Sequence, residues 1–532
     1  MESNSNKESS IKDILSPSPK FWGIRTEQWI KVFFFGNAWM SILILFLIAV
    51  FLFREGASFF SLRNGSHQLY RRAGLEFVEE FKLTQEHFTS IYRYLNEVRT
   101  NQINILREKG MSFQEAQEKC VEIEDYAYSF YDLSVRLGEL TSELSDFVTT
   151  FRDQFLSNEN LRDYQQTLVE AGKVEEAEAV QIDPVDFELI RTLLIEQREV
   201  YNETTTALVE DISSFRKTFP ELPSGETQTI HSRFIQETDA FIASIPEHAK
   251  RLQEWDPDKP IGWSSSFTSF LFGRNWVTNS FWQDWYGFLP LLTGSLLVSA
   301  IALTIAIPVG VFAAIYVNQV APSREQKIVK PCIEFISAVP SVVLGFFGIA
   351  VLSELLKTIS GWPGLDWLPF FPITERLNAF TAGCLLALMA IPTIFTLAED
   401  ALDMVPRAHI EASYSMGATR LQTIIHIVLP SALSGIISAI LLGFGRVIGE
   451  TMVVLLCAGN RIIIPDISEG LGVMVEPVHT MTGIIAQEMG EVERGSIHYR
   501  ALFVLGMFLF VISLTINGIA QRIVKRVKTT NL

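Results

Sequence analysis

Six apolar runs alternate with polar segments along the 532 residues of this chain. The runs lie near residues 33–53, 288–317, 333–356, 379–398, 431–457 and 501–520. Each is long enough to cross the hydrocarbon core of a bilayer, which takes about 20 residues in a helix. The pattern therefore predicts an all-α, polytopic membrane protein of about six transmembrane helices.

One long polar block, residues 61–260, separates the first two runs. From Phe77 to Ile105 its apolar positions follow the 4-3 spacing that is typical of a coiled-coil seam. Ser112 with Glu115 has the sequence of a capping box. Further helices are predicted to open at Ser112, Asp183 and Thr227. We predict a coiled-coil-like helical domain inserted between spans one and two, which serves either as a docking surface or spacer for a partner or as a packing element alone.

The negative charge of the chain belongs to this block. Residues 61–260 contain 21 Lys and Arg against 38 Asp and Glu, a net charge of −17, whereas the rest has 22 of each. An acidic surface repels anions within a Debye length, about 8 Å at physiological salt. The block is therefore not expected to collect an anionic substrate.

Basic residues between the runs predict the orientation. With six spans, fourteen Lys and Arg of the tails and loops fall on one side of the membrane and five of the short loops on the other. The positive-inside rule then places both termini in the cytoplasm of a bacterium and residues 61–260 in the periplasm. Residues 1–32 are predicted to be a cytoplasmic tail, and 33–53 a retained inner-membrane anchor, because no small-residue cleavage site follows Phe53.

An amphipathic stretch, residues 411–430, lies between the fourth and fifth runs. The pattern predicts a short helix that ends at Gly417, a second helical piece, and Pro430 at the start of the next span. Its defining positions are Glu411, Ala412, Gly417, Ile427, Leu429 and Pro430. We expect a helix-turn-helix at the cytoplasmic membrane surface that a partner can grip.

The fifth run contains Arg446 and Glu450. A charge at mid-bilayer costs about 2.5–3.5 kcal/mol even on the insertion scale, so two of them need a reason. Four residues apart on one helix, they form either a structural ion pair or an anion site in which the arginine binds and the glutamate eases release. Ser341, Thr293 and Thr451 are candidate donors to a passing anion, although such side chains often bond their own backbone.

These motifs resemble a known family. The stretch 411–430 resembles the EAA loop of ABC-transporter permeases, with Ser413 where a second Ala is usual. The segments GRVIGETMVVLLCAGN, VPSVVLGFFGIAVL, YGFLPLLTGSLLVS and EMGE with HYRALFVLGMFLFVISLTIN are similar to those of the PstC-type phosphate permease. The resemblance covers residues 30–60 and a permease domain at 266–525, and says nothing of the polar block.

The resemblance implies an importer subunit for inorganic phosphate, with Arg446, Glu450, Thr451 and Ser341 on the substrate path. It implies a sister permease, two ABC ATPase subunits and a periplasmic phosphate-binding protein as partners, in contact with lipid and without nucleic acid. ATP and Mg²⁺ would be bound by the ATPase, since the chain has no G-x-x-x-x-G-K-S/T loop and no metal-site spacing; we expect no enzyme activity, cofactor or metal here. The alternatives are a permease for sulfate or molybdate, a channel or transporter that uses no ATP, or a membrane sensor or docking protein that uses the helical domain.

Overall fold

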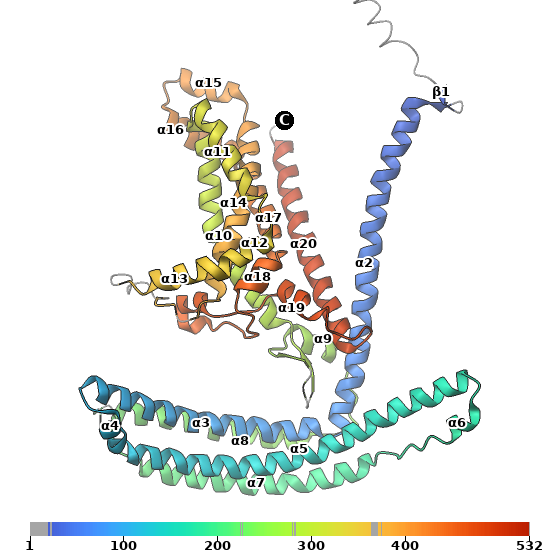
Figure 1. The fold of residues 1–532 in the computed structure, drawn as a ribbon, viewed down its shortest axis with the longest axis vertical. Coiled ribbons are helices and arrows are strands. Elements are labelled where there is room, and N and C mark those ends of the chain that lie inside the picture. Colours follow the sequence, from blue (N-terminus) through green and yellow to red (C-terminus); the bar gives the residue numbers. More distant parts are fainter. Residues whose placement is uncertain are drawn as a thin grey trace, which may run out of the picture. The chain divides into compact units, whose positions relative to one another are not determined.

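Figure 1 shows the computed structural model of the chain, which describes residues 20–530 except 22–23, 224, 226, 279, 281–282, 363–370 and 374. The chain forms two units. The first, here called the membrane unit, comprises the described residues of Met1–Leu62, Phe267–Thr278 and Trp285–Leu532. The second, here called the polar unit, comprises those of Arg63–Ser266 and Asn279–Asp284.

Six helical segments of the described chain are long and apolar enough to span a membrane, as predicted. They are Ile30–Arg72, Leu289–Val320, Ser341–Ser360, Ala379–Asp403, Arg420–Ile448 and Ile497–Ile523. The first belongs to α2 (Thr26–Arg72), which continues as one helix well beyond its apolar part. The third begins later than its apolar run, because residues 333–336 belong to the amphipathic α11 (Ser323–Ile336) and Pro340 separates it from α12 (Ser341–Phe347).

The centre of the membrane unit is built by α10 (Leu289–Ile315), α14 (Ala379–Asp403) and α17 (Leu429–Ile448), with α20 (Ile497–Thr530) against α17. Buried small residues such as Ala302, Ala306 and Ala390 allow α10 and α14 to pack closely. Two further helices, α18 (Met452–Cys457) and α19 (Met481–Glu488), pack on each other.

The remaining elements of the membrane unit are short. They are β1 (Lys20–Phe21), β2 (Ile24–Arg25), β3 (Trp276–Val277), β4 (Trp285–Tyr286), α13 (Ser353–Ser360), α15 (Arg407–Ser415), α16 (Arg420–Thr423), the π-turns Tyr316–Val320, Gly348–Leu352 and Ile424–Val428, and the 3₁₀ segment Ile467–Val475. The short α9 (Trp263–Leu271) begins in the polar unit and ends in the membrane unit. The strands pair as two antiparallel hairpins, β1 with β2 and β3 with β4. Within this unit α15 and α16 lie at one end, and α13 and α19 lie towards the other (Figure 1).

Long helices build the polar unit: α3 (Leu75–Glu108), α5 (Val121–Glu170), α7 (Phe187–Lys217) and α8 (Thr227–Glu254), with the short α4 (Phe113–Lys119) and α6 (Val174–Glu178). The predicted seam of α3 is buried, from Phe77 to Gln102. Ser112 and Glu115 form the predicted capping box, but it opens only α4, and α5 starts anew after Cys120. The third helix opens three residues later than predicted, because Asp186 rather than Asp183 accepts the first backbone N–H groups.

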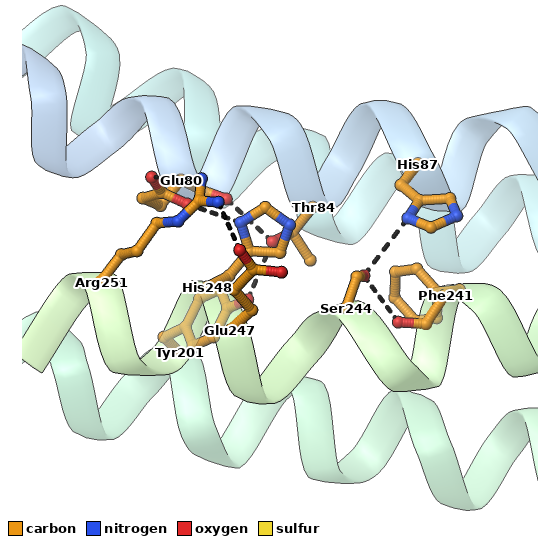
Figure 2. A network of polar contacts seen from close by, with 9 residues as sticks. All are labelled: Glu80, Thr84, His87, Tyr201, Phe241, Ser244, Glu247, His248 and Arg251. Atoms are coloured by element: carbon orange, nitrogen blue, oxygen red, sulfur yellow. Dashed lines mark hydrogen bonds and ion pairs between the residues drawn. The ribbon is translucent and has the colours of Figure 1, made fainter.

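Phenylalanines fill the core of the polar unit, among them Phe88, Phe130 and Phe234. A polar network lies beside them (Figure 2). In this network His248 Nδ1 is 2.5 Å from a Glu80 carboxylate oxygen, and the Arg251 guanidinium approaches the same carboxylate at 3.5 Å. The Tyr201 and Thr84 hydroxyls are 2.8 Å apart. These contacts join α8 and α7 to α3, which fixes the register of the bundle.

Candidate functional site: an exposed helix-turn-helix and an interrupted charged span

The stretch 411–430 folds as a helix-turn-helix. α15 ends at Ser415, and Gly417 has φ +85°, the left-handed conformation that glycine adopts without strain. The Gly417 N–H bonds the Tyr414 carbonyl and the Ala418 N–H bonds the Ser413 carbonyl, which is the hydrogen-bond pattern of a Schellman motif. The predicted glycine stop is therefore confirmed in its local geometry.

Side chains brace the turn from within. Thr419 caps α16 in a capping box with Gln422. The Ser413 hydroxyl is 2.9 Å from that of Thr423, a contact that alanine at 413 could not make. The departure from the usual EAA sequence thus supplies a hydrogen bond across the two helices.

The outer surface of this loop is open. Glu411, Ala412 and Gly417 are exposed, and Met416 is 89% exposed. Ile427 and Leu429 are half-buried, Ile424 is buried, and Val428 belongs to a core cluster of the membrane unit against which Leu429 packs. The loop therefore presents apolar and charged groups outward while its base is anchored.

Pro430 lies in the first turn of α17, as predicted, and α17 is continuous with the helical structure before it. Helical structure runs without interruption from Arg420 to Ile448. A π-turn at Ile424–Val428 precedes the proline, and such a turn accommodates the ring and its missing N–H inside a continuous helix. Pro430 therefore has the predicted position in the first turn of α17, but the span itself begins earlier, at Arg420.

The fifth span is interrupted at its charged motif. α17 ends at Ile448, residues 449–451 are non-helical, and α18 begins at Met452. Arg446 lies in the last turn of α17, where a cation interacts favourably with the helix dipole. Glu450 lies in the interruption, so the prediction that both charges share one helix face is wrong. Among the described residues, no ion pair joins Arg446 to Glu450.

Arg446 instead reaches towards α14. Its Nη1 donates a hydrogen bond of 2.9 Å to the Thr393 hydroxyl, and the side chain is otherwise exposed. Close packing brings the two helices within reach: a Cβ on Gly443 would meet Ile394 Cγ1 at 2.7 Å. A Cβ on Gly445, in the same helix, would have no such close contact, since its nearest neighbour would lie 3.8 Å away.

Glu450 lines a small cavity together with four residues that carry hydroxyl groups. Ser295 and Ser299 come from α10, and Thr480 and Thr482 from the start of α19. The Thr482 hydroxyl donates to the Glu450 carbonyl at 2.8 Å. The cavity measures about 10 Å³, which is the lower limit for one water molecule. In this conformation it is too small for a tetrahedral oxyanion.

The three hydroxyl donors predicted for a passing anion do not lie together in one site. Thr451 is half-buried in the interruption, and its hydroxyl lies 3.5 Å from the Gly449 carbonyl. Ser341 is half-buried at the first position of α12. Thr293 bonds the carbonyls of its own helix, the common behaviour of such residues. The role of all these residues on a substrate path stays a prediction.

Sequence reasoning missed Thr393 and the four hydroxyl residues around Glu450. Thr393 directly follows Pro392. Proline has no N–H and so frees a backbone carbonyl of the membrane helix, and this irregularity was the available signal of a polar site. No comparable sequence signal accompanies the hydroxyl residues of α10 and α19 that surround Glu450. In the described parts of the chain, no three His, Cys, Asp or Glu side chains gather as metal ligands would.

Taken together, the fold and the site define a polytopic helical membrane protein with a charged, interrupted span and an exposed surface loop. A sequence profile described as "binding-protein-dependent transport system inner membrane component" matches residues 306–529. The chain is 32% identical over 246 residues to a probable ABC transporter permease protein of Bacillus subtilis, YqgH, covering 46% of this chain and 73% of that protein. It is 29% identical over 271 residues to the phosphate transport system permease protein PstC of Haemophilus influenzae, covering 49% and 83%.

A solved structure of the MetNI methionine ABC transporter overlaps 45% of this chain and 93% of its own at 21% identity, with a TM-score of 0.32, a likeness too weak to carry an argument. The sequence relationships suffice. The chain belongs to the family of binding-protein-dependent transport system inner membrane components, and it is a multi-pass membrane transport subunit with additional sequence that these relatives do not match.

Proposed function

We propose that this chain is the translocation subunit of an ATP-driven importer for inorganic phosphate. The observation that carries the proposal is the Arg446 guanidinium, exposed in a membrane span beside an interruption of the helix. A guanidinium offers a rigid fork of donors that matches a tetrahedral oxyanion. The likeness to permeases named for phosphate transport supports phosphate as the ion.

Glu450 gives a chemical reason to prefer phosphate over sulfate. Near neutral pH, phosphate carries a proton on at least one oxygen and can donate it to a carboxylate, whereas sulfate at the same pH has no donor. The carboxylate also offsets the positive charge of Arg446, so that binding stays weak enough for release. The two residues would act together only in a conformation in which the interruption opens, because the cavity at Glu450 is now too small.

The helix-turn-helix at 411–430 is the proposed contact for the motor. Its exposed Glu411 and Met416 offer a surface for an ATPase subunit, and its anchored base continues directly into α17 and Arg446. ATP-driven closure of two ATPase subunits would push on this loop and reorient the spans, giving alternating access. ATP and Mg²⁺ are bound by those partners in this proposal, and this chain hydrolyses nothing.

The proposed topology places both termini and the 411–430 loop in the cytoplasm and residues 61–260 in the periplasm of a bacterial inner membrane. Within the membrane unit, α15 and α16 lie at the end opposite α13, which supports opposite sides of the membrane for the 411–430 loop and α13 (Figure 1). The proposed partners are a sister permease, the ATPase pair and a periplasmic phosphate-binding protein. Isolation of the intact complex with identification of its subunits tests this set, and a complex without an ATPase would contradict it.

Substitution of Arg446 tests the substrate site. Uptake of labelled phosphate is expected to be abolished in Arg446→Gln and strongly reduced in Arg446→Lys, which keeps the charge but loses the fork. Arg324→Gln, at an exposed position of α11, is the matched control. Unchanged phosphate uptake in Arg446→Gln would contradict the assignment. If this variant kept its phosphate uptake but lost uptake of sulfate or molybdate, Arg446 would bind that other oxyanion.

A further inference from the structure

One hydrogen bond ties the interruption of the fifth span to another part of the fold. The Thr482 hydroxyl, at the start of α19, donates to the Glu450 carbonyl at 2.8 Å. The Glu450 N–H, by contrast, bonds the Val447 carbonyl of α17 at 3.2 Å. The Thr451 hydroxyl lies 3.5 Å from the Gly449 carbonyl, inside the interruption itself. Among the residues that the structure describes, Thr482 is therefore the one hydrogen-bond partner that the interruption has outside the α17–α18 segment.

The Glu450 carbonyl needs such a partner. An interrupted helix leaves carbonyl groups without their usual N–H donors, and inside a membrane an unsatisfied carbonyl is costly. Glu450 is half-buried and Thr482 is 6% exposed. The bond is therefore sheltered from water, which would otherwise replace the hydroxyl as donor.

The segment that carries the donor is held against α10. The Met481 N–H donates to the Ser295 hydroxyl of α10 at 2.9 Å, and both residues are buried. A Cβ on Gly294 would overlap the His479 carbonyl oxygen, so the glycine allows α10 to come this close. The Thr482 hydroxyl is thus presented from a packed part of the membrane unit.

The start of α19 is fixed locally as well. The Thr480 hydroxyl caps the helix by accepting the Gly483 N–H at 3.1 Å, and the Thr480 N–H donates to His479 Nδ1 at 3.0 Å. Because Nδ1 accepts, the proton of the neutral ring is on Nε2, which lies 3.1 Å from Gln487 Oε1. These contacts set the direction in which Thr482 meets the interruption.

The bond holds Glu450 in the closed conformation. Glu450 here borders a cavity of about 10 Å³, too small for a tetrahedral oxyanion. The interruption has to open before Glu450 and Arg446 can act together, and a movement of the backbone at 450 away from α19 breaks the bond. Loss of one net hydrogen bond changes an equilibrium about two- to tenfold, which biases the closed conformation without preventing opening.

We propose that the Thr482–Glu450 hydrogen bond is a latch that keeps the interruption closed, which makes Thr482 a positioning residue for Glu450. This inference rests on the proposed function. The latch acts on the backbone carbonyl and leaves the carboxylate free to meet the substrate once the interruption opens. Ser295 supports the latch indirectly, through Met481.

A continuous helix links the latch to the proposed motor contact. Helical structure runs from Arg420, within the 411–430 loop, to Ile448, next to the interruption. A displacement of the loop is therefore transmitted along this helix to the residue that the latch holds. Release of the latch is the point at which the push of the ATPase reaches the substrate site.

The test measures water access at position 450 with a reporter thiol. Glu450→Cys keeps the backbone carbonyl and hence the latch, and Cys332→Ser removes the exposed native thiol. Uncharged methyl methanethiosulfonate is added without ATP to membranes that contain the full-length chain and its co-expressed partners. The labelling rate of each cysteine is followed by mass spectrometry. A thiol reacts as its thiolate, which burial in apolar surroundings disfavours, so the rate at position 450 is expected to be low while the latch is intact.

Removal of the hydroxyl supplies the decisive comparison. Thr482→Val should raise the labelling rate at position 450 about two- to tenfold, whereas Thr482→Ser should keep it near that of the parent. Thr304→Val is the matched control, because the exposed Thr304 hydroxyl bonds only the Ala300 carbonyl of its own helix, α10. An unchanged rate in Thr482→Val would overturn the latch.

A general loosening of the fold is recognised by a second thiol. The native Cys384 on α14 is half-buried, and its labelling rate should be the same in Thr482→Val as in the parent. If Thr482→Val failed to assemble or exposed Cys384 too, Ser295→Ala would decide, since it frees the Met481 N–H and keeps Thr482. A raised rate at position 450 alone in Ser295→Ala would support the latch, and an unchanged rate would overturn it.

The outcomes separate the two proposals. An unchanged rate at position 450 in Thr482→Val overturns the latch even if Arg446→Gln abolishes phosphate uptake. If Arg446→Gln leaves phosphate uptake unchanged, the proposed substrate site fails. The thiol rates would then still report whether Thr482 holds the interruption closed.

Discussion

The Arg446 guanidinium on α17 donates a 2.9 Å hydrogen bond to the Thr393 hydroxyl on α14. Arg446 is exposed and this hydroxyl fixes its direction. A hydrogen bond to a charged group contributes about 1.5–3 kcal/mol when sheltered, and less where water competes. The contact therefore orients the proposed anion donor without neutralising it, which a carboxylate partner would do.

Replacement of Thr393 tests this orienting role. Thr393→Val should lower the rate of phosphate uptake several-fold, whereas Thr393→Ser should retain it, because only the hydroxyl is needed. Thr396→Val is the matched control, since the Thr396 hydroxyl bonds only the Pro392 carbonyl of its own helix. Equal uptake by Thr393→Val and the control would show that Arg446 needs no partner on α14.

Close packing of α17 on α14 is a second requirement. A Cβ at Gly443 would lie 2.7 Å from Ile394 Cγ1, whereas one at Gly445 would lie 3.8 Å from its nearest neighbour. Gly443→Ala should therefore destabilise the protein by about 1–3 kcal/mol through overpacking and reduce uptake. Gly445→Ala should leave both the melting temperature and uptake near wild type, and the reverse order would contradict the packing.

The same region shows how far the sequence could be read. The turn at Gly417 and the α3 seam are local patterns, written in a glycine, a capping sequence and a 4-3 repeat, and they were predicted. The interruption at Glu450 was not, because Gly449 within an apolar run is equally typical of close helix packing. The Arg446–Thr393 contact joins residues 53 apart, and only the three-dimensional packing of α14 on α17 determines it.

A buried hydroxyl pair in the polar unit predicts unequal effects of two similar changes. Thr84 donates to the Glu80 carbonyl and is 2.8 Å from the Tyr201 hydroxyl, and both side chains are nearly fully buried. Thr84→Val leaves the tyrosine hydroxyl buried without a partner and should cost about 1–3 kcal/mol. Tyr201→Phe leaves Thr84 bonded and should cost about 0.5–1.5 kcal/mol.

Hydrogen exchange of α3 and α7 in the intact protein measures this difference. The double variant Thr84→Val/Tyr201→Phe should lose less protection than the sum of the two single variants, since removal of both partners leaves no orphaned hydroxyl. Additive losses would show that the two hydroxyls do not interact.

Acid should loosen the polar unit through His87. Burial lowers the pKa of His87 below its usual 6.5, nearby His248 lowers it further, and Glu237 opposes both. The folded state therefore binds a proton less readily than the unfolded state. The contribution of neutral His87 to the free energy of unfolding is therefore complete above pH 6.5. It is lost as the pH falls through the lowered pKa that His87 has in the folded state.

The pH dependence can be followed by hydrogen exchange of α8, which holds Ser244 against the His87 ring at 3.2 Å. Protection, corrected for intrinsic exchange, should decline below pH 6.5 in the native protein and decline less in His87→Gln. His409→Gln, at an exposed position of α15, should behave as the native protein. Identical acid profiles for native protein and His87→Gln would assign the effect to other groups.

The exposed tip of the 411–430 loop gives the sharpest test of coupling to an ATPase. Met416 is 89% exposed immediately before the Gly417 turn, and Leu421 is 66% exposed just after it. Apolar side chains so placed stabilise an interface only when a partner covers them. Met416→Glu should therefore lower co-purification of the ATPase and phosphate uptake together, with no change in thermal stability, because the side chain has few contacts to lose.

The matched control is Phe113→Glu on α4, where Phe113 is 58% exposed. It makes a similar chemical change away from the loop and should leave the complex intact. Loss of the ATPase from both variants would indicate a general defect, and its retention in Met416→Glu would place the motor's contact elsewhere, since a charge at the centre of an apolar interface costs far more than one at its rim.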